Sequence, residues 1–198
     1  MKSSFFLQLA INKQKITTQR KIKGYIFSKV GDFFNLFYQN HLQFNLTGAQ
    51  KRVVKEIRKD LGSGVHMNRL LQGDVGSGKT LVAVLNMLIA IDNGYQACLM
   101  APTEILAIQH FNTIAELLNE MAVSIQLLTG SSTKVQRSKI HKDLKDGSLN
   151  ILIGTHALLE DIVEFKNLGL AVIDEQHRFG GAQRSRLWKR TIILLIYW

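Results

Sequence analysis

Eight consecutive residues have the types and the spacing that bind the phosphates of a nucleotide. They are Gly73-Asp74-Val75-Gly76-Ser77-Gly78-Lys79-Thr80, which match the pattern G-x-x-x-x-G-K-[ST]. Glycines let such a loop curl, so that backbone N–H groups point inward at phosphate oxygens. Lys79 would reach the β- and γ-phosphates, and the hydroxyl of Thr80 would bind Mg²⁺. The alternative, a glycine-rich turn with a stray lysine, requires a coincidence expected in about one chain of this length in a hundred.

A second candidate group is the acidic pair Asp174-Glu175, which ends the apolar run 168–173. Ligands of open α/β sheets bind at the carboxyl ends of the strands, and a phosphate loop that follows a strand lies at the same edge. Asp174 would therefore bind Mg²⁺, and Glu175 would polarise the water that attacks the terminal phosphate. Two solvated loop acids are the alternative.

The elements that must position these groups alternate regularly along the chain. Apolar runs predict strands near 68–72, 96–101, 124–128, 150–154 and 169–173. Longer periodic segments predict helices near 27–38, 47–61, 79–92, 104–121 and 133–146. The strands are continuous apolar runs, which suit a parallel sheet covered on both faces. We therefore expect an α/β fold of three layers with a mostly parallel central sheet.

Several separated motifs, in this order, resemble those of the superfamily 2 helicases, in the form found in bacterial helicases that act on branched DNA. They are Leu46–Gln50, Gly73–Thr80, Ala101–Ala107 with Gln109-His110, Leu128–Ser131, Gly154–Ala157 and Asp174–Gly180. The resemblance covers nearly all of residues 1–190. It implies a RecA-like P-loop NTPase lobe that uses ATP and Mg²⁺ and acts on branched DNA. Other superfamily 2 motors, the transcription-repair coupling factor and the primosomal helicase, are the alternative relatives.

The resemblance also implies roles for single residues. Gln50 would recognise adenine, while its sequence position equally predicts a capping box with Thr47. The DNA contacts would come from loops that follow strands, at Thr103, Gly130, Thr155 and His156. Gln176 and His177 would link ATP hydrolysis to DNA binding.

The same comparison divides the chain into three parts. Residues 1–40 would be a basic, helical linker that joins a wedge domain to the motor, and residues 41–190 would be the first motor lobe. Residues 191–198 carry no charge and no turn residue, so we interpret them as an aberrant tail, a frameshift or truncation scar, that resembles an aggregation-prone edge segment. A second lobe and the wedge domain are absent from these residues, so we expect negligible activity from the chain alone.

Composition excludes several other classes of protein. Apolar residues make up 46% and charged residues 20%, which excludes a disordered tail and a fibre. Cys98 is the one cysteine, so no internal disulfide forms, and we expect a reducing, cytoplasmic location. No apolar run approaches the roughly 18 residues of a membrane helix, so we expect no membrane partner.

The net charge of +10 gathers at the two ends of the chain. Residues 1–31 hold seven bases and no acid, and residues 184–190 hold four bases and no acid. Basic ends of this kind can hold a nucleic acid through its phosphates. A solvated surface, a non-enzymatic DNA-binding module and a pseudogene product remain open as alternatives.

Overall fold

The computed structural model describes residues 25–42, 45–65, 67–175 and 192–197, the last of these as main chain. The strands are β1 Asn68–Gln72, β2 Gln96–Met100, β3 Ile125–Leu128, β4 Ile151–Gly154, β5 Leu168–Asp174 and β6 Ile192–Tyr197. The helices are α2 Asp32–Leu36, α3 Gly48–Leu61, α4 Lys79–Asp92, α5 Glu104–Leu117 and α6 Lys134–Asp146. Two single turns complete the described elements, the π-helical η1 Phe37–His41 and the 3-10 η2 His156–Leu159.

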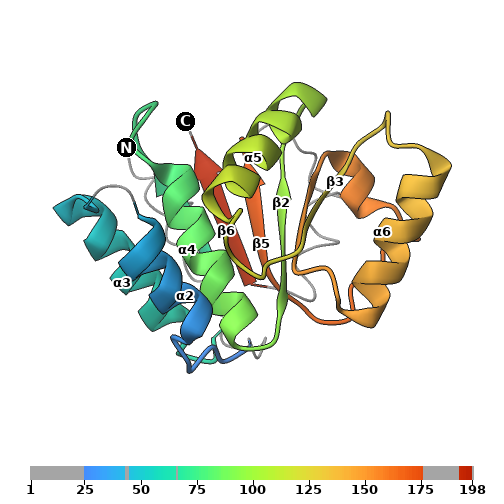
Figure 1. The fold of residues 1–198 in the computed structure, drawn as a ribbon. Helices are drawn as coiled ribbons and strands as arrows, with labels where there is room; N and C mark the ends of the chain where they lie inside the picture. The colour runs from blue at the N-terminus through green and yellow to red at the C-terminus, as the bar shows by residue number, and fades with distance from the viewer. Residues whose placement is uncertain (1–24, 43–44, 66, 176–191, 198) are drawn as a thin grey trace, which may run out of the picture.

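The strands form one sheet in the order β1-β6-β5-β2-β4-β3, and every neighbouring pair is parallel. In the centre of the sheet, Met100 of β2 lies opposite Ile173 of β5 on one side and Gly154 of β4 on the other. Parallel strands require crossover connections, and α4, α5 and α6 supply those that link β1 to β2, β2 to β3 and β3 to β4 (Figure 1). The α/β fold with a parallel central sheet, predicted from the apolar runs, is confirmed.

Strand β6 differs from the sequence interpretation of residues 191–198. We expected a segment outside the lobe that resembles a sheet edge, but Ile192–Tyr197 lies inside the sheet, between β1 and β5. Its main chain pairs with both neighbours, so that Ile193 lies opposite Asn68 of β1 on one side and opposite Ala171 of β5 on the other. An uncharged run of strand length suits such a doubly paired position. The boundary at residue 190 therefore does not coincide with the end of the sheet.

Two hydrophobic cores lie on the two faces of the sheet. Alternate strand residues such as Leu99, Ile153 and Val172 belong to the larger core, which also contains buried residues of α3, α4 and α5. Their neighbours, such as Cys98 and Leu152, pack with residues of α6 and η2 in the second core. This alternation follows from the two-residue period of a strand, and it produces the three layers.

The helix ends follow the sequence closely. Thr47 and Gln50 form the predicted capping box at the start of α3. Gly147, in the left-handed conformation at φ 85°, ends α6 as expected. The helix predicted over 104–121 is shorter, because Leu118 leaves helical geometry at φ −111°, ψ 13°. The helix predicted over 27–38 begins later, at Asp32, and continues through η1 to His41.

The N-terminal segment is attached to the carboxyl end of α4. The carboxylate of Asp92 accepts backbone N–H bonds from Gly31, Phe33 and Phe34 at 3.0–3.1 Å, so it caps α2 from another helix. Phe27 and Phe37 are buried in the larger hydrophobic core, so this segment also packs against the lobe through its aromatic side chains. None of the described helices is long and apolar enough to cross a membrane.

Candidate functional site

The phosphate-binding loop lies where the motif predicts, between β1 and α4. Gly76 and Gly78 adopt left-handed backbone conformations, at φ 79° and φ 80°. The backbone conformation requires glycine at Gly78, and a Cβ there would also displace the end of the Gln50 side chain from the loop. These two glycines curl the loop at the start of α4, and a curl of this kind suits backbone N–H groups that bind an anion.

Lys79 lies inside this loop with 3% of its surface exposed. Its Nζ donates to the carbonyls of Gly73 at 2.7 Å and Asp74 at 2.5 Å, and to Ser77 Oγ at 3.1 Å. Burial lowers the pKa of Lys79 below its ordinary value, while the nearby charges of Asp74 and Asp174 act in the opposite direction. The amine is therefore held at the centre of the loop, within electrostatic reach of Asp174.

The acidic pair ends β5, as the sequence predicts. Asp174 is the last residue of the strand and is fully buried. Glu175 follows in the left-handed region at φ 48°, which costs a residue with a side chain about 1–2 kcal/mol. Such strain is found at functional sites, where the surrounding structure imposes it. The strand end thus presents two carboxylates at the sheet edge that carries the phosphate loop.

The structure adds a partner for Asp174 that the residue patterns did not reveal. His110 Nε2 lies 2.8 Å from Asp174 Oδ2, and both side chains are buried. His110 belongs to the inward stripe of α5, with Ala107 and Ile114. A histidine in an apolar stripe is the signal that could have indicated a buried polar partner.

Gln50 performs the predicted capping and also contacts the phosphate loop. Its Oε1 accepts the N–H of Thr47 at 2.9 Å, and its Nε2 donates to the carbonyl of Ser77 at 2.9 Å. The same side chain therefore fixes the start of α3 and one wall of the loop. Its predicted contact with adenine stays a prediction.

The four predicted DNA-contact residues lie after the carboxyl ends of three adjacent strands. We call the loops 101–104, 129–133 and 155–160 the rim. Thr103, Gly130 and His156 are exposed there. Thr155 is only 4% exposed, and its Oγ1 is buried without a hydrogen-bond partner. The rim therefore offers three of the four residues to a ligand.

Two charged side chains hold the rim together. Glu104 accepts hydrogen bonds from Thr129 Oγ1 at 2.9 Å and from the hydroxyl of Ser131. These bonds, first that from Ser131, lower the pKa of Glu104. Arg137 donates to the carbonyls of Thr129 and Ser132 and pairs with Glu160 at 3.1 Å. The three loops are thus connected by side-chain bonds.

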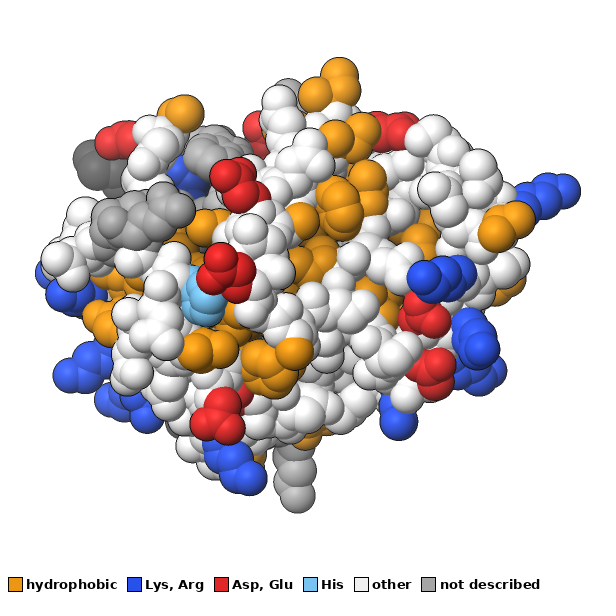
Figure 2. All heavy atoms as spheres, viewed as in Figure 1, with side chains coloured by type: hydrophobic (Ala, Val, Ile, Leu, Met, Phe, Trp, Pro, Cys, Tyr) orange, Lys and Arg blue, Asp and Glu red, His pale blue; other side chains and the backbone are white. Residues whose placement is uncertain are grey.

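The two basic ends of the sequence fall mostly on residues that the structure does not describe. Residues 1–24 and 176–191 lie outside the described residues, and with them Gln176, His177 and most of both basic segments. Within the described part, α6 exposes Lys134, Lys139, Lys142 and Lys145. Figure 2 shows the face of the molecule seen in Figure 1. Lys and Arg side chains lie mainly along its margins, including the margin at α6, and hydrophobic side chains lie in its middle.

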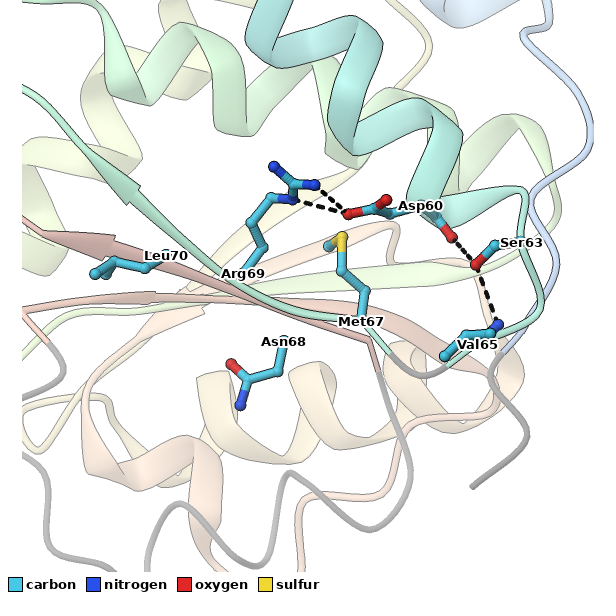
Figure 3. A pocket seen from close by; sticks show the side chains of 7 residues that line it. All are labelled: Asp60, Ser63, Val65, Met67, Asn68, Arg69 and Leu70. Atoms are coloured by element: carbon cyan, nitrogen blue, oxygen red, sulfur yellow. Dashed lines mark hydrogen bonds and ion pairs between the residues drawn. The ribbon is translucent and has the colours of Figure 1, made fainter. Parts of the chain in front are cut away.

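A separate pocket of about 360 Å³ lies at the amino end of β1, the end away from the phosphate loop. Figure 3 shows Arg69 turned toward Asp60 of α3, with which it pairs at 2.6 Å. The pocket is lined by Asp60, Ser63, Val65, Met67, Asn68, Arg69 and Leu70. The main charged groups of this pocket satisfy each other, and none of the predicted site residues lines it.

A glycine-rich loop of the phosphate-binding pattern, a carboxylate at the end of a buried strand and a parallel sheet are together typical of a P-loop NTPase domain. The model of the family "DEAD/DEAH box helicase" matches residues 47–196, and the chain belongs to this family. It is 48% identical over 186 residues to the ATP-dependent DNA helicase RecG of Aquifex aeolicus, a match that covers 94% of this chain and 23% of that protein. The RecG of Synechocystis sp. is likewise 48% identical, over 92% of this chain and 22% of the relative. The predicted resemblance to a superfamily 2 helicase of this type is confirmed.

Solved structures agree with the sequence matches. The structure of RecG bound to a three-way DNA junction superposes with a TM-score of 0.86 at 42% identity, covering 99% of this chain and 26% of that one. The helicase MrfA superposes with a TM-score of 0.63 at 19% identity, which shows the shared fold alone. The chain thus spans about a quarter of the length of the RecG proteins that it matches.

Proposed function

We propose that this chain is the ATP-binding lobe of a DNA helicase motor and that it binds ATP together with Mg²⁺. The observation that carries the proposal is that Lys79 is buried inside the phosphate loop while Asp174 is buried at the end of β5, at the same edge of the parallel sheet. Family membership supports the use of ATP.

The donor set fits a magnesium ion. The hydroxyl of Thr80 and the carboxylate of Asp174 are hard oxygen donors, which Mg²⁺ prefers. Within the described ranges, no group of three or more His, Cys, Asp or Glu side chains could hold a metal by itself. That composition suits Mg²⁺, which is commonly held by one or two protein ligands together with nucleotide phosphates. When bound, the ion would neutralise charge on the phosphates.

The chain's own residues would do the rest of the work. Lys79 would exchange its carbonyl partners at Gly73 and Asp74 for phosphate oxygens, without leaving the loop. The N–H groups at the start of α4 would add their partial positive charge. Glu175 would orient the attacking water, and Gln50 would lie beside the base, where its bond to Ser77 keeps the loop in place.

We also propose branched DNA as the partner and the cytoplasm as the place of action. The RecG relatives are named as DNA helicases, and one of them was solved on a three-way junction. The exposed residues Thr103, Gly130 and His156 would contact phosphates of the DNA, which position a duplex without reading its sequence. Gln176 and His177 would connect this contact to ATP hydrolysis.

By itself the chain is expected to hydrolyse ATP negligibly. A motor of this kind closes two lobes over ATP, and an arginine from outside the first lobe can contribute about 10³–10⁵-fold to the rate. The 198 residues supply the loop, Asp174 and Glu175, but the arginines of a second lobe would have to come from elsewhere.

Calorimetric titration with an ATP analogue in the presence of Mg²⁺ tests the proposal. The wild-type chain should bind one nucleotide, and Lys79→Ala should reduce the affinity at least about tenfold. Lys166→Ala, which removes an exposed lysine on the β4–β5 connection, is the matched control. Equal affinity of Lys79→Ala and wild type, or robust DNA-stimulated hydrolysis by the purified chain, would contradict the respective part of the proposal.

A further inference from the structure

The buried contact between His110 and Asp174 joins two parts of the lobe that the sequence separates by 64 residues. His110 Nε2 and Asp174 Oδ2 are 2.8 Å apart, and the side chains are 9% and 0% exposed. A fully buried carboxylate is costly unless polar partners surround it, and the imidazole is one such partner. The contact also restricts the rotation of the carboxylate about its own bonds.

The fold explains why these two residues meet. Strands β2 and β5 are adjacent and parallel, and Met100 and Ile173 lie opposite each other near the ends of both strands. Helix α5 starts just after β2 and packs over the sheet with Ala107, His110 and Ile114 inward. His110 therefore lies over the end of β5, where Asp174 ends the strand.

The same helix begins at the rim. Thr103 caps α5 through its side chain, and Glu104 in the first turn bonds Thr129 and Ser131. His110 lies seven residues after Thr103, about 10 Å along the helix axis. Helix α5 is thus bonded to the rim at its start and to Asp174 two turns later.

We infer that His110 is a positioning residue, which holds the Asp174 carboxylate in the orientation that binds the metal of the metal–nucleotide complex. The inference rests on the proposed function, because it requires Asp174 to be a metal ligand. Carboxylates that bind metals are generally held by a second group in this way, and loss of that group typically lowers metal affinity about 10–100-fold. His110 does not touch the nucleotide in this assignment, so nucleotide binding without metal does not depend on it.

Titration with Mn²⁺, as a substitute for Mg²⁺, in the presence of ADP tests the inference on the full chain. His110→Leu should weaken Mn²⁺ affinity about 10–100-fold and leave the metal-free affinity for ADP within about twofold. His110→Gln, which keeps an N–H donor, should recover most of the lost affinity. His141→Leu on α6 is the matched control, because His141 Nε2 is buried without a hydrogen-bond partner.

The outcomes separate the inference from the proposed function. If the wild-type chain binds no Mn²⁺ with ADP, the proposed function itself is wrong. If wild type binds and His110→Leu binds Mn²⁺ equally well, the inference alone is overturned. Should His110→Leu fail to fold, the ¹⁵N resonances of the His110 ring in the wild-type chain decide. They should shift when Mg²⁺ is added to the ADP complex, and unchanged resonances would overturn the inference.

Discussion

The side-chain amide of Gln50 bridges two elements, because it accepts from Thr47 N and donates to the carbonyl of Ser77, each at 2.9 Å. One bond belongs to the capping box of α3, and the other reaches the phosphate loop 27 residues away. The two roles of Gln50 can be separated, because a carboxylate can accept the first bond but cannot donate the second.

Gln50→Glu and Gln50→Ala should therefore differ in their free energies of unfolding, while both should lose the bond to the carbonyl of Ser77 in the phosphate loop. Gln50→Ala should lower the free energy of unfolding by about 0.5–1.5 kcal/mol, since the bond from Thr47 N–H to the side chain is lost while the N-cap bond to Thr47 Oγ1 remains. Gln50→Glu should stay within about 0.5 kcal/mol of wild type. Both variants should speed hydrogen exchange of the amides at Ser77–Thr80. Unchanged exchange in Gln50→Glu would show that the bond to Ser77 does not hold the loop.

Asp92→Ala should release the N-terminal segment from α4. Three backbone N–H groups lose their acceptor, and α2 loses the carboxylate that caps it. We expect a loss of about 1–2 kcal/mol in denaturant unfolding, with faster hydrogen exchange confined to residues 31–36. Glu116→Ala, which removes an exposed carboxylate on α5, is the control and should show neither effect. Wild-type exchange at Phe33 and Phe34 in Asp92→Ala would contradict the cap.

Gly154, at the end of β4, should tolerate alanine far less well than Gly130, in the rim. A Cβ at Gly154 would collide with the carbonyl of Leu128 and the side chain of Leu158, whereas nothing lies within 4 Å of a Cβ at Gly130. Gly154→Ala should cost about 1–3 kcal/mol, as overpacking of a closed site does. Gly130→Ala should remain within about 0.5 kcal/mol. Equal unfolding midpoints for the two variants would contradict this packing.

The thiol of Cys98 should be unreactive until the chain unfolds. Burial raises the pKa of Cys98 from its ordinary value of 9.0 to about 12. Because the folded state holds the proton more tightly, this contribution to stability is complete below pH 9 and is lost as the pH rises toward 12. A disulfide reagent at pH 8 should modify Cys98 only at the rate of unfolding, and rapid modification of the native chain would show that the strand is accessible. Cys98→Ala should remove the contribution from the alkaline stability profile.

Local patterns were sufficient to predict most elements of this fold. Strands β2, β4 and β5 are largely apolar runs of strand length, and the phosphate loop is a contiguous motif, so both can be read from neighbouring residues. The placement of the phosphate loop and Asp174 at one edge of the sheet followed from topology, since parallel strands bring their carboxyl ends to one edge.

Relationships between distant residues could not be predicted in the same way. Nothing in the run Ile192–Tyr197 specifies that it lies between β1 and β5, because strand order depends on packing of the whole sheet. The contact of His110 with Asp174 depends on the register of α5 over β5, which no spacing along the chain encodes. The bond of Gln50 to Ser77 likewise depends on how α3 packs beside the loop.

The central claim is that the phosphate loop and Asp174 hold one nucleotide with its metal. Electron paramagnetic resonance of Mn²⁺, titrated into the chain with an ATP analogue, tests it most directly. We expect one Mn²⁺ per chain, bound only with nucleotide and weakened at least about tenfold by either Thr80→Val or Asp174→Asn. Glu164→Gln, an exposed carboxylate paired with Lys145, is the control and should bind as wild type does. Mn²⁺ binding that neither variant changes would contradict the claim.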